Sequence, residues 1–88
     1  MKAGRKPRSR LADDAAAALW RSAGFTVDAP EGRVGIVEDA VRIPGLKRPA
    51  ALAVRIGAHG ERVVLVPVTE IVRVDTESRT ITLHEAPK

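Results

Sequence analysis

The stretch RVGIVEDAVRI, residues 33–43, decides the fold, because its apolar residues recur with the period of two that is typical of a β-strand. Val34 and Ile36 fall on one face of such a strand, whereas Val41 and Ile43 fall on the other. The apolar face therefore changes sides near the acidic pair in the middle of the stretch. We expect a bulge or bend there, because one extra residue reverses which side chains point inward.

Turn residues divide the chain on both sides of this stretch into further short strands. The pair Pro44-Gly45 follows it as a turn, and residues 57–60 (GAHG) close a hairpin. Pro67 has no N–H for a sheet hydrogen bond, so the fourth strand is expected to end there. Short strands at regular spacing predict a mainly β protein, a small antiparallel β-barrel of five to six strands. The expected strands are residues 25–27, 33–43, 51–56, 62–66, 71–74 and 79–84.

Ahead of the first strand, residues 11–24 have the pattern of one N-terminal α-helix. Leu11 and Leu19 belong to a row of apolar residues spaced four apart, which lies on one helical face. Ser9 is suited to cap the start of the helix, and Gly24 is suited to end it. A helix of about a dozen residues is marginal by itself, so its apolar face is expected to dock on the barrel or on another copy of the chain.

Length and composition point to one small domain. The chain has 88 residues, 44% of them hydrophobic, and it contains no Cys. A chain of this length buries only about 60–65% of its unfolded surface, which leaves little depth for an enclosed active site. The absence of Cys excludes disulfides and thiolate chemistry. A binding module is therefore favoured over an enzyme, and we expect no small-molecule substrate.

The positive charge is concentrated at the N-terminus. The formal net charge is +4, yet residues 1–10 hold five cations and no acid, so the rest of the chain is nearly neutral. Residues 1–10 lack apolar periodicity and are expected to form a disordered basic tail. Asp13 and Asp14 interrupt the apolar stretch that follows, which argues against a secretory signal. No apolar run is long enough to span a membrane, and the expected location is the cytoplasm.

The order of these elements resembles the PRC-barrel family over residues 27–85. The resemblance implies a PRC-barrel-like domain at residues 25–86, after the tail (1–10) and the helix (11–24). The family includes the C-terminal half of RimM-type ribosome-maturation factors, the cytoplasmic domain of the photosynthetic reaction-centre H subunit, and small stand-alone bacterial proteins, which this chain resembles most. The matching segments are GRVGIVED at 32–39, ALAVR at 51–55, VPVTEIV at 66–72, and Asp75 with RTITL at 79–83.

The resemblance implies a function in protein interaction, which is the common role of the family. The family has no catalytic motif for this sequence to match. We therefore expect a non-catalytic adaptor that associates with itself as a homodimer or with an unidentified protein partner. Leu19, Trp20 and Phe25 are the candidate protein-interface residues, because a large aromatic side chain on a marginal helix is a suitable anchor. An uncovered sheet edge would favour self-association as well.

The basic tail supports an alternative function. Arg5, Lys6, Arg8 and Arg10 are candidates for nucleic-acid binding through phosphate contacts, in an accessory or ribosome-associated factor. The few charges of the tail alone support only weak binding at physiological salt. The other interpretation is a solvated leader that aids solubility.

We recognise no catalytic, cofactor-binding or metal-ligating set in the sequence. His59 and His84 have no His or Cys nearby in the sequence to form a metal site. Glu38 and Asp39 are neighbours, but adjacent residues of a strand point to opposite faces, which argues against a joint acid–base role. One of these two acids is instead expected to accept a hydrogen bond from a backbone amide exposed by the bend.

Overall fold

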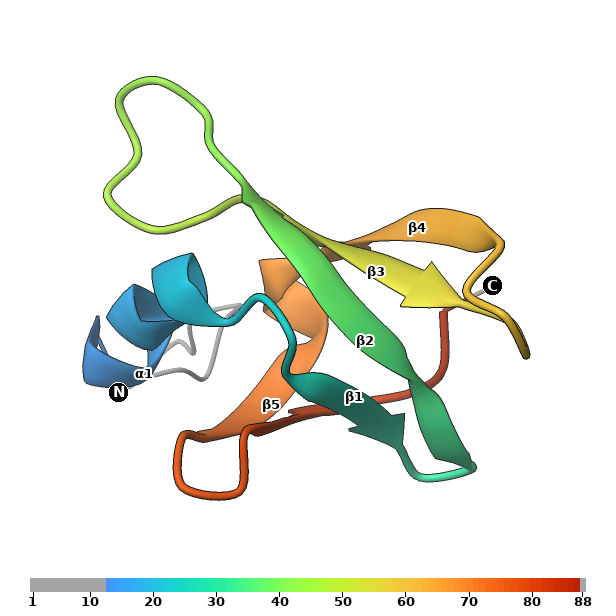
Figure 1. Cartoon of the computed structure of the whole chain (residues 1–88). Helices are drawn as coiled ribbons and strands as arrows, with labels where there is room; N and C mark the ends of the chain where they lie inside the picture. Colours follow the sequence, from blue (N-terminus) through green and yellow to red (C-terminus); the bar gives the residue numbers. More distant parts are fainter. Residues whose placement is uncertain (1–12, 88) are drawn as a thin grey trace, which may run out of the picture.

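A computed structural model describes residues 13–87 and places six strands in one sheet (Figure 1). The predicted mainly β fold with one N-terminal helix is confirmed. The helical segments are α1 (Asp13–Ala18), η1 (Leu19–Arg21) and η2 (Val68–Glu70), of which η1 and η2 are 3₁₀ helices. The strands are β1 (Thr26–Ala29), β2 (Gly32–Val41), β3 (Ala51–Ile56), β4 (Arg62–Pro67), β5 (Ile71–Asp75) and β6 (Thr80–Leu83).

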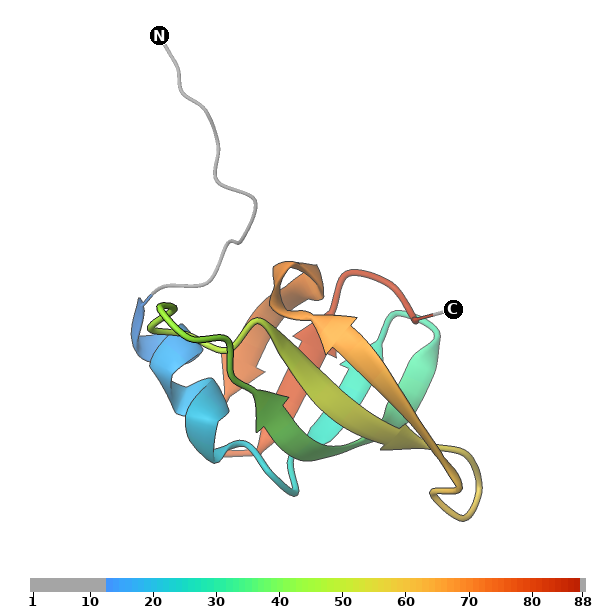
Figure 2. The ribbon, with the colours of Figure 1, turned by 90° about the horizontal axis from the view of Figure 1, so that it is seen from above.

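The strands follow the order β4-β3-β2-β1-β6-β5 across the sheet. Strands β1 to β4 form an antiparallel meander, and β5 and β6 form a hairpin. Strand β6 pairs with β1 in parallel, so this one pair departs from the predicted antiparallel arrangement. The cause is η2, which carries the chain from β4 across to β5 and so returns β6 beside β1. Strands β4 and β5 remain as the two edges, and the barrel is open between them (Figure 2).

Strand β2 bends where the sequence predicts a bulge. Opposite β3, the register passes from Val37 to Asp39 and leaves Glu38 as an extra residue. A second shift opposite β1 lies near the start of the strand. Between the two, Gly35 approaches β3 so closely that a Cβ there would lie 2.2 Å from the carbonyl oxygen of Arg55. Only glycine fits this position.

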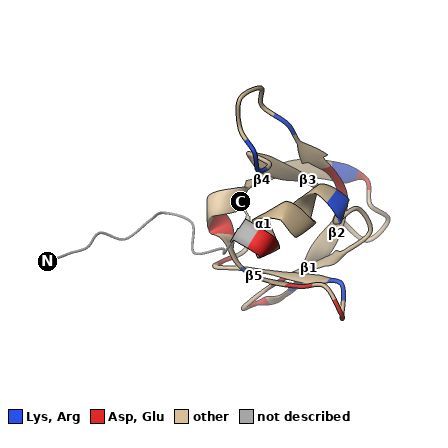
Figure 3. Ribbon diagram, turned by 90° about the vertical axis from the view of Figure 1, so that its left-hand side faces the viewer, with Lys and Arg blue, Asp and Glu red and all other residues tan. Residues whose placement is uncertain are grey.

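The hydrophobic core fills the space between the curved sheet and the helical segment, which lies across one end of the barrel (Figure 3). Leu52 and Val54 of β3 are fully buried, as are Ile81 and Leu83 of β6. The buried core residues are Leu19, Phe25, Val27, Ala29, Val37, Leu52, Val54, Val66, Val68, Ile71, Ile81 and Leu83.

The helical segment ends earlier than the predicted boundary of residues 11–24. The hydroxyl and the N–H of Ser22 both donate to the carbonyl oxygen of Leu19, at 2.8 and 3.2 Å. These bonds tighten the last turn into a 3₁₀ helix, so the helix stops before Gly24. Residues 1–12, including the predicted disordered tail, lie outside the described residues. Within residues 13–87, no helix is long and apolar enough to span a membrane.

Residues 42–50 form a loop that projects beyond the sheet on the side of α1 (Figure 1). Strand β2 ends at Val41, earlier than predicted, and the N–H of Ala50 donates to the carbonyl oxygen of Val41 at 3.0 Å. Within the loop, the N–H of Leu46 donates to the carbonyl oxygen of Ile43 at 3.1 Å. The loop therefore begins and ends beside the same residue of β2.

Candidate interaction surface

The three predicted interface residues lie in different environments. Leu19 is fully buried and Phe25 is 6% exposed, and both belong to the core. Their side chains are therefore not available to a partner in this structure, whereas half-buried Trp20 reaches the surface. An interface role of Trp20 stays a prediction. The four residues predicted to bind nucleic acid lie outside the described residues: Arg5, Lys6, Arg8 and Arg10.

Trp20 of η1 contacts two residues of the loop 42–50 and so holds the loop against η1. Its indole Nε1–H donates to the carbonyl oxygen of Lys47 at 2.9 Å. The guanidinium carbon of Arg42 lies 4.3 Å from the centroid of the indole ring, which is within cation–π range. Both contacts hold the aromatic side chain within its own chain.

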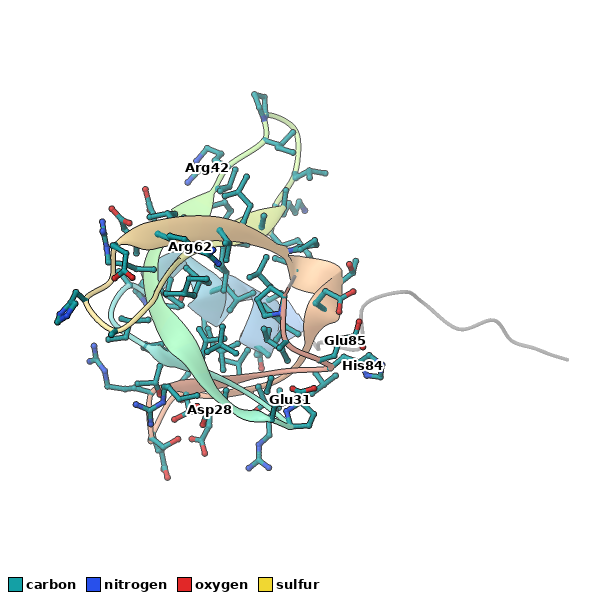
Figure 4. All side chains as sticks on the ribbon, turned by 90° about the vertical axis from the view of Figure 1, so that its right-hand side faces the viewer. Asp28, Glu31, Arg42, Arg62, His84 and Glu85 are labelled. Carbon is teal, nitrogen blue, oxygen red and sulfur yellow. The ribbon has the colours of Figure 1, made fainter. Side chains whose placement is uncertain are left out.

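Glu38 and Asp39, the acidic pair at the bulge of β2, make different contacts. The Oε1 atom of Glu38 forms an ion pair with Nη2 of Arg55 at 2.7 Å. The Oδ1 atom of Asp39 accepts the N–H of Ala40 at 2.8 Å, which confirms that one of the acids binds a backbone amide at the bend. His84 lies beyond the end of β6, in the same region as Glu85 (Figure 4). In the described part of the chain, no three His, Cys, Asp or Glu residues are grouped so that they could hold a metal ion.

Exposed apolar side chains gather on the outer face of β2, β3 and β4. Ile36 stands opposite Arg55, which stands opposite Val63, and Ala53 stands opposite Leu65 in the next pair. Directly paired residues point to the same face of a sheet. Ile36 and Val63 are each 49% exposed, and Leu65 is 64% exposed. We call these five residues the outer strip.

Sequence reasoning did not single out Val63 and Leu65 as surface residues. The apolar run VVLV at residues 63–66 could have indicated them. A strand with one face in water normally alternates apolar and polar residues, so an uninterrupted run places apolar side chains on the outer face as well. Ile36 was recognised as apolar, but the register of β2 directs Val37 into the core and Ile36 outward.

Arg55 lies in the middle of the outer strip, and its charge is paired with that of Glu38. Besides the ion pair with Glu38, its Nη1 donates to the carbonyl oxygen of Gly60 at 2.9 Å. A cavity of about 670 Å³ beside the hairpin is lined by Arg55 and Arg33. Arg33 in turn pairs with Asp28 at 3.0 Å. The arginines of this cavity are therefore neutralised by acids of the same chain.

The turn between β5 and β6 positions β1. The Oδ1 atom of Asp75 accepts the N–H groups of Glu77 and Ser78, at 3.0 and 3.1 Å. Chiefly the hydrogen bond from the Ser78 backbone lowers the pKa of Asp75 below its ordinary value of 3.8. Arg79 completes the turn with φ +57°, and its carbonyl oxygen accepts the N–H of Thr26 at 2.9 Å.

The six-stranded open barrel with one short N-terminal helix defines a PRC-barrel-like fold. It is similar to the crystal structure of a protein from Pseudomonas aeruginosa described as a 16S ribosomal RNA processing protein, RimM, with a TM-score of 0.59 and 16% sequence identity. The match covers 90% of this chain and 48% of that one, so this chain spans about half the length of its structural neighbour. At this identity the likeness shows the fold alone. No family model matches the sequence, and a search of curated proteins finds no match.

Proposed function

We propose that the chain is a non-catalytic protein-interaction module of PRC-barrel type that acts as an adaptor in the cytoplasm. The outer strip carries this proposal. Its apolar residues come from three adjacent strands, and its one cation is matched by Glu38. Ala53, Val63 and Leu65 adjoin one another on β3 and β4, and a contiguous exposed apolar surface is typical of a protein-binding site.

The strip also supplies a useful free energy of binding. Complete burial of a Val or Leu side chain contributes about 1.5–3 kcal/mol. Because Leu65 is 64% exposed and Val63 is 49% exposed, covering both would contribute about 2–3 kcal/mol in total. Such a contribution matches that of the few residues that dominate the energy of a protein interface.

Affinity capture from a lysate of the source cells tests the proposal. The bait is the full chain, compared with Leu65→Lys and with Val72→Lys as the matched control, because Val72 is 41% exposed on β5 and lies outside the strip. We expect a set of proteins, counted by mass spectrometry, that Leu65→Lys loses and Val72→Lys retains. If both variants capture the same proteins as the natural chain, the strip is not the binding site.

An accessory nucleic-acid or ribosome-associated factor is the second candidate. The loop 42–50 favours it, because the loop carries Arg42, Lys47 and Arg48 and no acid. The N-terminal cations and the fold likeness to RimM agree with this candidate. Fluorescence anisotropy with structured RNA at two salt concentrations tests it, because each phosphate contact contributes about 0.9 to the logarithmic salt slope. If the salt slope stays the same when Arg5, Lys6, Arg8 and Arg10 are changed to Gln, the tail makes no phosphate contacts.

A further inference from the structure

The two edges of the sheet differ in how they are protected. Strand β5 carries the charges of Arg73 and Asp75 and has an irregular register at Val72. Charges and bulges of this kind prevent an edge from pairing with another strand. Strand β4 has no charge between Arg62 and Pro67 and pairs with β3 in an unbroken register. The edge of β4 is therefore suited to accept a further strand.

The hydrogen bonds of β4 show which backbone groups face that edge. The N–H of Val68 donates to the carbonyl oxygen of Ala50 at 3.1 Å. Because antiparallel pairs alternate between bonded and non-bonded, the even-numbered residues of β4 direct their backbone groups to β3. Val63, Leu65 and Pro67 direct theirs outward. Pro67 has no N–H, which suits an outward position.

We infer that β4 pairs with β4 of a second copy of this chain, antiparallel, about a two-fold axis at Val64. This inference rests on the proposed function, because the pairing joins the outer strips of two copies. Val63 then stands opposite Leu65 of the second copy, and each N–H donates to the carbonyl oxygen of the other residue. If the register shifts by two residues toward the end of β4, Val63 stands opposite Pro67 of the second copy, which has no N–H to donate. A slip the other way sets Leu65 against Glu61, outside the strand.

The same register brings opposite charges together. Arg62 comes to lie opposite Val66 of the second copy, and Val66 lines a cavity of about 240 Å³ together with Glu70 and Glu85. Among the described residues, none of these three charged side chains has an ion pair within its own copy. Arg62 and Glu85 lie well apart on one copy (Figure 4). Their charges are therefore complementary between copies, and the two outer strips join into one surface.

Sedimentation velocity of the purified full chain over a range of concentrations tests the pairing. We expect a reversible dimer whose dissociation constant rises about tenfold or more in Leu65→Lys, because the change puts a charge on the paired edge. Val63→Pro should have a similar effect, because it removes an outward N–H that β3 does not use. Val72→Lys is the control and should leave the dimer unchanged. Circular dichroism shows whether each variant is folded.

Two further variants test the register. Arg62→Glu should weaken the dimer, and adding Glu85→Arg should restore it, because the ion pair is rebuilt with its charges exchanged. Val64→Cys should form a disulfide-linked dimer on mild oxidation, because residues on the axis have Cα atoms about 4.5 Å apart, within disulfide range. The natural chain has no Cys, so Val72→Cys is a clean control that should stay unlinked.

A chain that stays monomeric at every concentration overturns the inference. A dimer that Leu65→Lys, Val63→Pro and Arg62→Glu all leave unchanged overturns it as well, because the contact must then lie elsewhere. The capture experiment separates these failures from failure of the proposed function. If the chain is a monomer and Leu65→Lys still loses captured proteins, the proposed function stands with another partner. If the chain is a monomer and Leu65→Lys captures the same proteins, both the pairing and the proposed function are overturned.

Discussion

Replacing Gly35 by Ala tests the close approach of β2 and β3. The added Cβ would lie 2.2 Å from the carbonyl oxygen of Arg55 and 2.9 Å from Cγ2 of Ile56. Since Cβ atoms essentially never come within 3.0 Å of another heavy atom, the strands must separate by about 0.8 Å. The obstacle is backbone, which cannot swing aside as the end of a side chain can.

The expected loss of stability is about 3 kcal/mol. Overpacking in a well-packed region costs about 1–3 kcal/mol, and each weakened hydrogen bond between the strands adds about 1 kcal/mol. A chain of this size has a total free energy of unfolding of about 4–13 kcal/mol. Gly35→Ala should therefore remove a large fraction of the stability and lower the melting temperature by at least about 10 °C.

Urea unfolding followed by the fluorescence of Trp20 provides the assay, because this is the single Trp of the chain. Gly45→Ala is the matched control, since Gly45 has φ +92° and no heavy atom within 4 Å of its added Cβ. The control should cost only the strain of a left-handed alanine, about 1 kcal/mol. Equal losses in the two variants would refute the steric argument.

Three further substitutions test the core, the loop and the turn. Leu52→Ala should cost about 2–5 kcal/mol in the same assay, because the side chain is fully buried, and a neutral effect would contradict its place in the core. Trp20→Phe should cost about 1–2 kcal/mol in thermal unfolding followed by circular dichroism, because the hydrogen bond to Lys47 is lost. The losses of stability in Trp20→Phe and Arg42→Ala should not be additive in the double variant, since the two side chains are in contact. Full additivity would contradict the cation–π pair. Asp75→Asn should destabilise the chain at neutral pH. Folding lowers the pKa of Asp75, so its stabilising effect is complete above the ordinary value of 3.8 and disappears as the pH falls through the lowered folded-state pKa. A loss of equal size in neutral and strongly acidic solution would contradict this account.

Much of the fold could be predicted because strand patterns are local. The change of apolar face along β2 is visible in the residues themselves, and the bulge at Glu38 follows from it. The inward positions of Leu52 and Ile81 follow from the same alternation. The parallel pairing of β1 with β6 could not be predicted, because it depends on how η2 redirects the chain rather than on either strand.

The candidate interaction surface was harder to predict. Leu19, Trp20 and Phe25 are large and apolar, and this property suits a core residue as well as an interface residue. Only the packing of the helical segment on the sheet shows that Leu19 and Phe25 are core residues. The outer strip depends on strand register, which brings together Val63 and Ile36 from distant parts of the sequence.

The parallel pair of β1 and β6 joins the meander of β1 to β4 to the hairpin of β5 and β6. The hydroxyl of Thr26 donates to the hydroxyl of Thr80 at 3.4 Å, across 54 positions of sequence. Closing so long a loop has an entropic cost before the contact can form, so folding should be slow for the size of the chain, in milliseconds to seconds. Strand β6 is also the sheet partner of β5. A chain still in synthesis therefore cannot complete its sheet until β6 has been made, and until then β1 keeps an open edge that can pair wrongly.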